Sequence, residues 1–587
     1  LLETHRRTLV SFLLRTAIFM FLIFAMFSSG AHARFGPWWH HPSPPPVEEP
    51  PVQPPADPPG NDIPIPANDP GFESTHFSGS ANCSSCHNRL RDENGTDVSI
   101  NSEWSASMMA NAARDPVFHA KFVSEVKRNP DLAPVMSEKC LRCHAPMASF
   151  EAEFNGDELT LLSDTGILDP ANPYHDEAME GVSCTVCHQI EDSEDLGEEG
   201  SFSGRFTIPT VGETSRRVAY GQYGAPFINL MRRWTGITPT HSGHMSESAV
   251  CGTCHNLKTP VVDSNGNVVS SETGHEFPEQ AIYSEWEHSD FADEGDNPQS
   301  CQDCHMKGAD GVRMANRPRR LSPVDNFKRH GFSGSNTVVM DILDRHRADL
   351  GVTSQAIDEA IASSREFLKS AAEIKIGSPV RVNGQLEVDV QVINKAGHKL
   401  PSGYPSRRVW IDFQVLDEQG EEIFRSGLMN ADGSIVGVDS DTIATQFEPH
   451  HEVISSEDQV QVYEAIMGNT DGHLTYTLLR AEGYLKDNRI PPSGFEKDDV
   501  PDDIAVVGDA YDDQDFDNGG DRVTYRFDAP PGSLQILATL RYQPLANGYL
   551  DDLFQDAELP LVSRLQAYWN QAEIRDETLA SEQLTIQ

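Results

Sequence analysis

The sequence has no cysteine outside a short repeated motif. Its ten cysteines all belong to five copies of Cys-x-x-Cys-His. A disulfide framework would not place a histidine after every second cysteine, so the pattern argues against a disulfide-stapled secreted protein. Zinc sites of this kind need motifs that pair off, which an odd number of motifs does not allow. The copies lie at 83–87, 140–144, 184–188, 251–255 and 301–305.

Basic residues are scarce in this chain. Lysine and arginine together number 45, against 90 aspartates and glutamates, and the formal net charge at pH 7 is −45. Such a surface argues against binding to nucleic acid or to an anionic membrane. It favours a cationic partner protein, and a solvated acidic surface like that of proteins from salty habitats is the alternative.

Long hydrophobic runs are also absent. The apolar run near the start of the sequence, Ala17–Phe27, falls well short of the roughly 20 residues that span a bilayer. Arg6 and Arg7 precede it and Ala31-His32-Ala33 follows it, the order of a secretory signal peptide cleaved after Ala33. An uncleaved anchor is the alternative. No cysteine stands at the cleavage site, which argues against a lipoprotein anchor.

The five motifs predict covalently bound haem c. Two thiols two residues apart add to the two vinyl groups of one haem, and the next residue, a histidine, reaches the iron. Five haems over residues 83–305 leave about 45 residues for each macrocycle, so we expect the porphyrins to form the core. The predicted haem-binding cysteines are Cys83, Cys86, Cys140, Cys143, Cys184, Cys187, Cys251, Cys254, Cys301 and Cys304, and the predicted proximal iron ligands are His87, His144, His188, His255 and His305.

The chain divides by composition into four parts, and the predicted fold class is α + β and multidomain. Residues 1–33 are the signal peptide and 34–72 a proline-rich linker. Residues 73–374 form a loop-rich helical domain with the five haems. Residues 375–587 form an all-β sandwich-like domain with a closing helix at 561–572. Covalent haem attachment agrees with export, to the periplasm, the outer-membrane surface or the outside of the cell.

Hydrophobic periodicity places the elements of the second half. Thr353 and Ser354 can cap a helix with apolar helical spacing that ends near Ile374. After that point the apolar residues alternate, which is typical of strands that are buried on one face. Strands are predicted at 386–392, 409–415, 459–463, 474–479, 523–527 and 534–542.

A partial internal repeat accompanies the motifs. Residues 102–110 and 284–292 share the pattern Ser-Glu-Trp-x-x-Ser-x-x-Ala. The pattern indicates two related units of helix plus haem motif. We expect Trp104 and Trp286 to pack on porphyrin faces or edges.

These residues carry a resemblance to a known family. Residues 103–118, the last four motifs with their flanking residues, and 278–286 resemble bacterial multihaem c-type cytochromes related to the tetrahaem electron carrier of ammonia oxidisers. The likeness continues through 330–336, 397–403 and 486–495. It implies an exported electron-transfer protein. It also implies sixth iron ligands among Met109, His175, His244, His330 and His398, and His398 would then attach the β-domain to one haem.

Three functions follow from this sequence. The leading hypothesis is an electron relay between redox proteins, themselves cytochromes, in the periplasm or at the outer membrane. The second is an oxidoreductase acting on a small nitrogen or sulfur compound at one haem with an open sixth position; the absence of a Cys-x-x-Cys-Lys motif weakens a nitrite-reductase assignment. The third is a subunit of an extracellular haem filament. Asp509–Asp521 has the carboxylates and glycines of a calcium loop without the EF-hand spacing, and a solvated acidic loop is the favoured interpretation.

Overall fold

The computed structural model describes residues 64–162, 165–209, 217–224, 226–270 and 274–587. The predicted signal peptide and most of the predicted linker lie outside this range. The described end of the linker packs against the helical region, because Ile65 is buried and its N–H donates to the Asp349 carbonyl at 2.8 Å. None of the helices within the described part is long and apolar enough to span a membrane.

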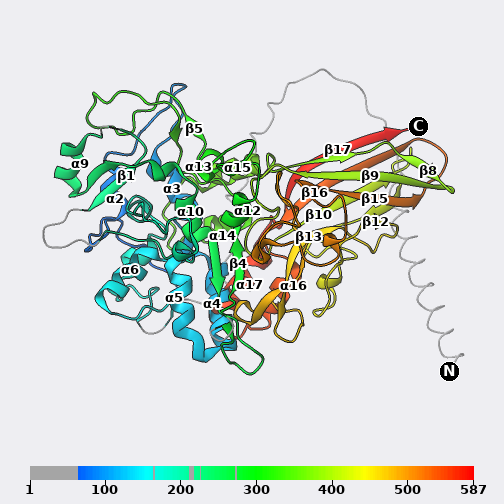
Figure 1. Ribbon diagram of the computed structural model, residues 1–587, viewed down its shortest axis with the longest axis horizontal. Helices are drawn as coiled ribbons and strands as arrows, with labels where there is room; N and C mark the ends of the chain where they lie inside the picture. The colour runs from blue at the N-terminus through cyan, green and yellow to red at the C-terminus, as the bar shows by residue number, and fades with distance from the viewer. Residues whose placement is uncertain (1–63, 163–164, 210–216, 225, 271–273) are drawn as a thin grey trace, which may run out of the picture. The chain divides into compact units, whose positions relative to one another are not determined.

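The first half of the described chain is made of short helices joined by long loops (Figure 1). Three of the five motifs lie entirely on helices and a fourth has its two cysteines on one, and the turn of a helix brings the two thiols and the histidine of a motif to one side. Asp115 shows why α4 begins where it does: its carboxylate accepts from Val117 and Phe118 N–H, and Pro116 occupies the first turn. The helices are α2 (Ser80–Ser84), α3 (Ile100–Ser105), α4 (Pro116–Arg128), α5 (Ala133–His144), α6 (Pro146–Asn155), α7 (His175–Met179), α8 (Cys184–Cys187), α9 (Ile228–Thr235), α10 (Ala249–His255), α12 (Ile282–Glu287), α13 (Cys301–His305), α14 (Thr337–Arg345) and α15 (Ile357–Leu368).

Six short strands lie among these helices and form three two-stranded sheets. β1 (Val218–Gly221) pairs in parallel with β2 (Thr238–His241). The pairs β3 (Asn256–Thr259) with β4 (Phe277–Ala281), and β5 (Gly308–Ala309) with β6 (Phe327–Lys328), are antiparallel. These sheets brace the loops between motifs.

The second half confirms the predicted α + β class with a β-sandwich. One sheet has the order β14-β13-β10-β16-β17 with β11 also on β10, and the other has the order β12-β15-β9-β7 with β8 also on β9. Every second residue of β9 from Leu386 to Val392 is buried, and these side chains share one core with residues of β10 and β16. The strands are β7 (Ala372–Ile376), β8 (Val380–Val382), β9 (Gln385–Asn394), β10 (Arg408–Leu416), β11 (Glu422–Ser426), β12 (Val453–Ile454), β13 (Val462–Asn469), β14 (Ala481–Asp487), β15 (Gly520–Asp528), β16 (Leu534–Gln543) and β17 (Glu577–Ile586).

Three predicted elements differ from the structure. The strand predicted at 459–463 begins at Val462 and runs to Asn469 as β13. The helix predicted from 353 to about 374 spans Ile357–Leu368, and Ala372–Ile376 is a strand because its alternate residues Ala372 and Ile374 enter the sandwich core. Residues 474–479 are not a strand. Tyr476 and Leu479 in that stretch pack into the helical core cluster instead of a sheet.

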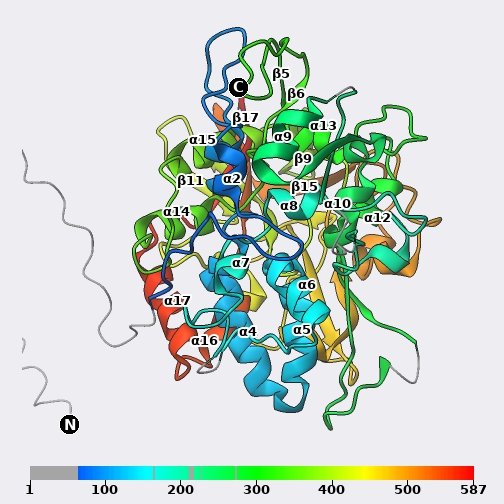
Figure 2. The same cartoon turned by 90° about the vertical axis from the view of Figure 1, so that its left-hand side faces the viewer.

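The helix predicted at 561–572 is present as α17 (Pro560–Gln571), which follows α16 (Asn547–Phe554), but it packs in the helical core and does not close the sandwich. Figure 2 shows α16 and α17 beside α4, on the helical half of the fold. The Tyr568 ring on α17 stacks on His346, with centroids 3.8 Å apart. The chain then returns to the sandwich as β17, a strand that we did not predict.

Candidate functional site

The histidines of four motifs are oriented alike. Each directs Nδ1 at a backbone carbonyl oxygen, which accepts the Nδ1 proton, so Nε2 remains for a metal. The Nδ1–oxygen distances are 2.7 Å for His87 and Met314, 2.9 Å for His144 and Ala112, 2.6 Å for His188 and Tyr220, and 2.8 Å for His305 and Ser333. Burial is the main cause that lowers the pKa of the fifth, His255, to about 4. All five imidazoles are therefore neutral, the form that binds iron.

None of the ten cysteines, all of which lie in the described part of the chain, forms a disulfide. In Cys140 and Cys187 burial raises the pKa, in Cys187 to about 12, so these sulfurs carry protons at neutral pH. A free thiol pair two residues apart, followed by a histidine with an available Nε2, is the donor set that haem c requires. The residues present therefore fit covalently attached haem at each motif.

Thiols from different motifs lie next to one another. The thiols of Cys83 and Cys184 lie close enough to shift each other's pKa, Cys83 downward and Cys184 upward, which links the first motif to the third. Cys143 and Cys254 link the second motif to the fourth, and the fourth is linked to the fifth by another such thiol pair, Cys251 and Cys301. Cys187 is close enough to Cys254 for the two to interact electrostatically, which joins the third motif to the fourth. The five attachment points thus form one connected series.

His330 and His398 each lie opposite a motif histidine. The ring centroids of His188 and His330 are 6.4 Å apart with 21° between the ring planes. Those of His305 and His398 are also 6.4 Å apart, with 19° between the planes. Two imidazoles that bind one metal from opposite sides, with metal–nitrogen bonds of about 2 Å, have centroids about 6 Å apart. Both pairs therefore have the spacing that a shared iron needs.

The other three predicted ligands are placed differently. His175 is buried and directs Nδ1 at the Ile167 carbonyl, 2.8 Å away, while its buried Nε2 contacts no polar partner in the described part of the chain. In His244, Nε2 lies 2.9 Å from the Ile190 carbonyl oxygen and Nδ1 lies 2.7 Å from the Ser242 hydroxyl, so both nitrogens are engaged.

Met109 is half-buried, and its carbonyl accepts the Val182 N–H at 2.9 Å, two residues before Cys184. Among the described residues, neither His175 nor His244 makes a ring contact with a motif histidine. Ligation by Met109, His175 and His244 stays a prediction. A sulfur-to-iron band in the near infrared that disappears in Met109→Leu would test the first of these.

A pocket of about 240 Å³ opens at the second motif. Cys140, Cys143 and His144 line it, and among its described lining residues His144 is the one histidine. Lys121, Glu125, Glu279 and Tyr404 add polar groups on the other walls. This pocket combines the haem-binding donor set with buried ionisable side chains.

Glu279 is a carboxyl group in that pocket whose pKa is raised. Burial, reinforced by the negative charge of Glu125, raises the pKa of its carboxyl group to about 8. Glu125 itself forms an ion pair with Lys121 at 2.9 Å. Glu279 therefore holds a proton at neutral pH. Composition gave no signal for this residue, because an isolated glutamate in an acidic chain does not stand out.

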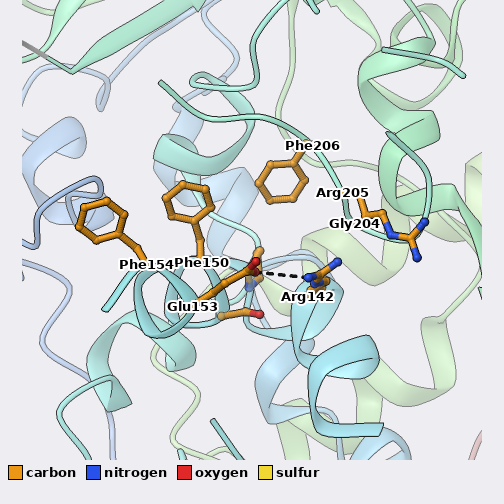
Figure 3. Close-up of a pocket in the computed structure, with 9 residues that line it drawn as sticks. Arg142, Phe150, Glu153, Phe154, Gly204, Arg205 and Phe206 are labelled. Carbon is orange, nitrogen blue, oxygen red and sulfur yellow. Dashed lines mark hydrogen bonds and ion pairs between the residues drawn. The ribbon is translucent and has the colours of Figure 1, made fainter. Parts of the chain in front are cut away.

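A second cavity, of about 500 Å³, lies between α6 and the segment 204–206 (Figure 3). In Figure 3 the Phe150 and Phe206 rings face it, and Arg142 reaches Glu153 across its edge. It contains no motif cysteine or histidine among its described lining residues. It is the larger of the two cavities, but the pocket at His144 is the one lined by motif cysteines and a motif histidine.

The predicted calcium loop contributes two residues to a buried cluster of His450, Asp513 and Asp521. Nδ1 of His450 accepts from the amides of Asn488 and Gln461, so Nε2 carries the proton and donates it to Asp513 at 3.1 Å. A protonated nitrogen pointing at the carboxylates does not suit calcium, which prefers an all-oxygen shell. The cluster is a hydrogen-bonded network, and the structure does not support the predicted calcium site.

Comparison with known proteins adds one family match. Residues 82–189, which include the first three motifs, match the family described as cytochrome c554 and c-prime. A crystal structure of a penta-haem cytochrome c552 from Thermochromatium tepidum aligns with a TM-score of 0.49 and 14% identity, covering 88% of this chain and 100% of that chain. No curated protein matches the sequence. The five motifs and the family match over the first three of them support covalently bound haem c at these positions.

Proposed function

We propose that the protein is an exported pentahaem cytochrome that relays electrons between redox proteins. The observation that carries this proposal is the connected series of attachment thiols, from Cys83 and Cys184 through Cys254 to Cys301. Haem supplies a one-electron iron couple, and neighbouring attachment points bring such couples close enough for exchange. The relation to the tetrahaem carrier of ammonia oxidisers, and a place in the periplasm or at the outer membrane, belong to the same proposal.

His188 with His330, and His305 with His398, are the proposed axial ligand pairs of two of the haems. Burial lowers the pKa of His330 to about 3 and also lowers that of His398, so both imidazoles stay neutral for iron. His398 stands on the loop after β9, so this pair joins the sandwich to the fifth motif. A ligand bond that forms only in the folded arrangement stabilises it.

A redox titration with spectra at each potential tests the relay. We expect the haems to titrate over overlapping potentials and to be reduced together when electrons enter at one of them. Intact mass should exceed that of the processed polypeptide by five haems, one for each motif. A haem that fails to equilibrate with the others, or a mass short of five haems, would contradict the relay.

A second candidate function is favoured by the pocket at His144. Its described lining has no second histidine opposite His144, and Met136 is the one thioether there. The protonated Glu279 could donate to a small nitrogen or sulfur compound bound in this pocket. Carbon monoxide binding to the reduced wild-type protein, lost when bulky side chains fill the pocket, supports this candidate. The absence of any ligand binding eliminates it.

The filament hypothesis predicts self-association, which sedimentation and imaging of the mature protein would detect. The partners of the relay are proposed to be other redox proteins, chiefly cytochromes with a cationic surface, because the chain itself is strongly acidic.

A further inference from the structure

The two Ser-Glu-Trp repeats make the same set of contacts. One copy lies on α3 and the other on α12, 182 residues later in the chain. In both copies the second serine donates its hydroxyl to the tryptophan carbonyl at 2.7 Å, Ser107 to Trp104 and Ser289 to Trp286. The sequence repeat is therefore also a structural repeat.

The tryptophan of each copy holds the start of a haem motif. Trp104 donates its indole N–H to the Val182 carbonyl at 2.8 Å, and Val182 stands two residues before Cys184. Trp286 donates in the same way to the Gln299 carbonyl at 2.9 Å, two residues before Cys301.

The backbone of these two residues is held from the other side as well. The Val182 N–H donates to the Met109 carbonyl at 2.9 Å, and the Gln299 N–H donates to the Phe291 carbonyl at 3.0 Å. Met109 and Phe291 occupy the same position of the repeat. Each copy therefore fixes the entry to one motif, whose histidine is His188 or His305.

The glutamate of each copy holds the loop that faces the same motif histidine. Glu103 accepts the backbone N–H of His330 at 3.0 Å and pairs with the guanidinium of Arg329 at 2.6 Å. Glu285 accepts the backbone N–H of Lys399, the residue after His398, at 3.0 Å and pairs with Arg489 at 2.9 Å.

Both glutamate side chains are largely shielded from water, which strengthens the hydrogen bonds that a carboxylate accepts. The Glu103 side chain is 12% exposed and that of Glu285 is fully buried. A carboxylate that accepts a backbone N–H and pairs with arginine forms charge-assisted hydrogen bonds, which are shorter and stronger than neutral ones. The second copy adds a packing contact, because a side chain at Gly397 would come within 3.3 Å of the Trp286 ring.

We propose that Glu103 and Glu285 are positioning residues for the axial histidines of two haems. Each repeat would clamp one haem from both sides, with its tryptophan on the proximal motif and its glutamate on the loop that carries the second histidine. This inference rests on the proposed ligand pairs His188 with His330 and His305 with His398. The role of the repeat is then to position the histidines that bind iron, in addition to packing the core.

The test compares four substitutions in the full-length holoprotein. Glu103→Ala removes both the N–H acceptor and the ion pair, whereas Glu103→Gln keeps an acceptor oxygen. Glu285→Ala and Glu285→Gln make the same comparison at the buried copy. Glu287→Gln is the matched control, because Glu287 lies on the same helix, is exposed and does not contact the His398 loop.

In each alanine variant we expect one haem of the five to become high-spin and to bind carbon monoxide when reduced. The glutamine variants should restore the low-spin signal wholly or in large part, and the control should match wild type. This rescue separates positioning from folding, since a variant that merely misfolds would lose several haem signals together. Electron paramagnetic resonance and carbon monoxide titration measure the outcome.

His330→Ala and His398→Ala separate this inference from the ligand assignment. If the histidine variants convert one haem and the alanine variants at Glu103 and Glu285 leave all haems low-spin, the clamp is wrong and the ligand pairs stand. If the histidine variants themselves change no haem, the ligand pairs fail and the clamp fails with them. Glu285 belongs to a buried network of ion pairs, so if its variants do not fold, Glu103→Ala and Glu103→Gln still decide.

Discussion

At the scale of single residues, burial sets the charge of the groups around the second motif. Glu279 lies in the interior near Glu125, and both effects oppose its ionisation. Lys121 offsets the charge of Glu125 by a direct ion pair, and its ammonium also donates to the Tyr476 carbonyl at 2.6 Å. Of the two carboxyl groups, Glu279 is therefore the one that is protonated near neutral pH.

The pH dependence of stability should report this proton. The pKa of Glu279 rises from 4.5 to about 8 on folding, so between these pH values the folded state binds more protons than the unfolded state. Its contribution to the free energy of unfolding should fall by about 1.4 kcal/mol for each pH unit as the pH rises through this window. Glu279→Gln should flatten the denaturant-unfolding profile between pH 5 and 8.

The exposed Glu366→Gln serves as the control, because Glu366 pairs only with Lys369 on the surface of α15. A profile for Glu279→Gln that runs parallel to wild type would show that the carboxyl is ionised in the folded protein.

At the scale of elements, a buried charge network ties the sandwich to α12. The ammonium of Lys399 and the guanidinium of Arg489 share the Asp487 carboxylate, each at 2.8 Å, and Arg489 also pairs with Glu285. All four side chains are at most 5% exposed. Two positive and two negative charges balance, so the network is stable only when complete.

Asp487→Asn should therefore destabilise the protein strongly. It leaves Lys399 and Arg489 in the interior with one remaining carboxylate, and removal of one partner from a buried ion pair costs about 3–5 kcal/mol. Chemical denaturation would measure the loss, with Asp528→Asn on the exposed end of β15 as the control. A loss below about 1 kcal/mol would mean that water screens the network.

Sequence predicts the elements of this fold better than the connections between them. Alternation at Leu386 to Val392 located β9 because one face of the strand enters the core. The same logic failed at 474–479, where Tyr476 and Leu479 pack on helices that are distant in sequence. The sequence did not predict β17. Its exposed face is polar, and its pairing with β16 brings together two segments that are separated in sequence.

The candidate site divides in the same way. Cys-x-x-Cys-His is local, so spacing alone identified the motif residues. The resemblance indicated His330 and His398 as ligands, but which motif histidine each of them faces depends on contacts across the fold and was not predicted. The sequence repeat identified Glu103 and Glu285, but it could not identify their hydrogen-bond partners, which lie 227 and 114 residues away in the chain.

At the scale of the whole molecule, charge should govern the relay. The full sequence carries −45 at pH 7, and haem propionates would add to this. A strongly acidic surface attracts a cationic partner over a distance set by ionic strength, about 10 Å at 0.1 M salt. Steering of this kind raises association rates, and added salt reduces it steeply.

We therefore expect reduction by a cationic cytochrome to slow by at least about tenfold between 0.01 and 0.5 M salt. Reduction by a small neutral reductant should change little over the same range, which controls for effects of salt on the haems themselves. Stopped-flow absorbance with both reductants measures the two rates.

An acidic cytochrome should show the opposite trend, because salt screens the repulsion. If the cationic and neutral reductants respond alike, the acidic surface serves solubility. Partner recognition must then rest on apolar contacts such as those of Phe227, at the start of α9, and Trp234, on α9, which are 58% and 75% exposed.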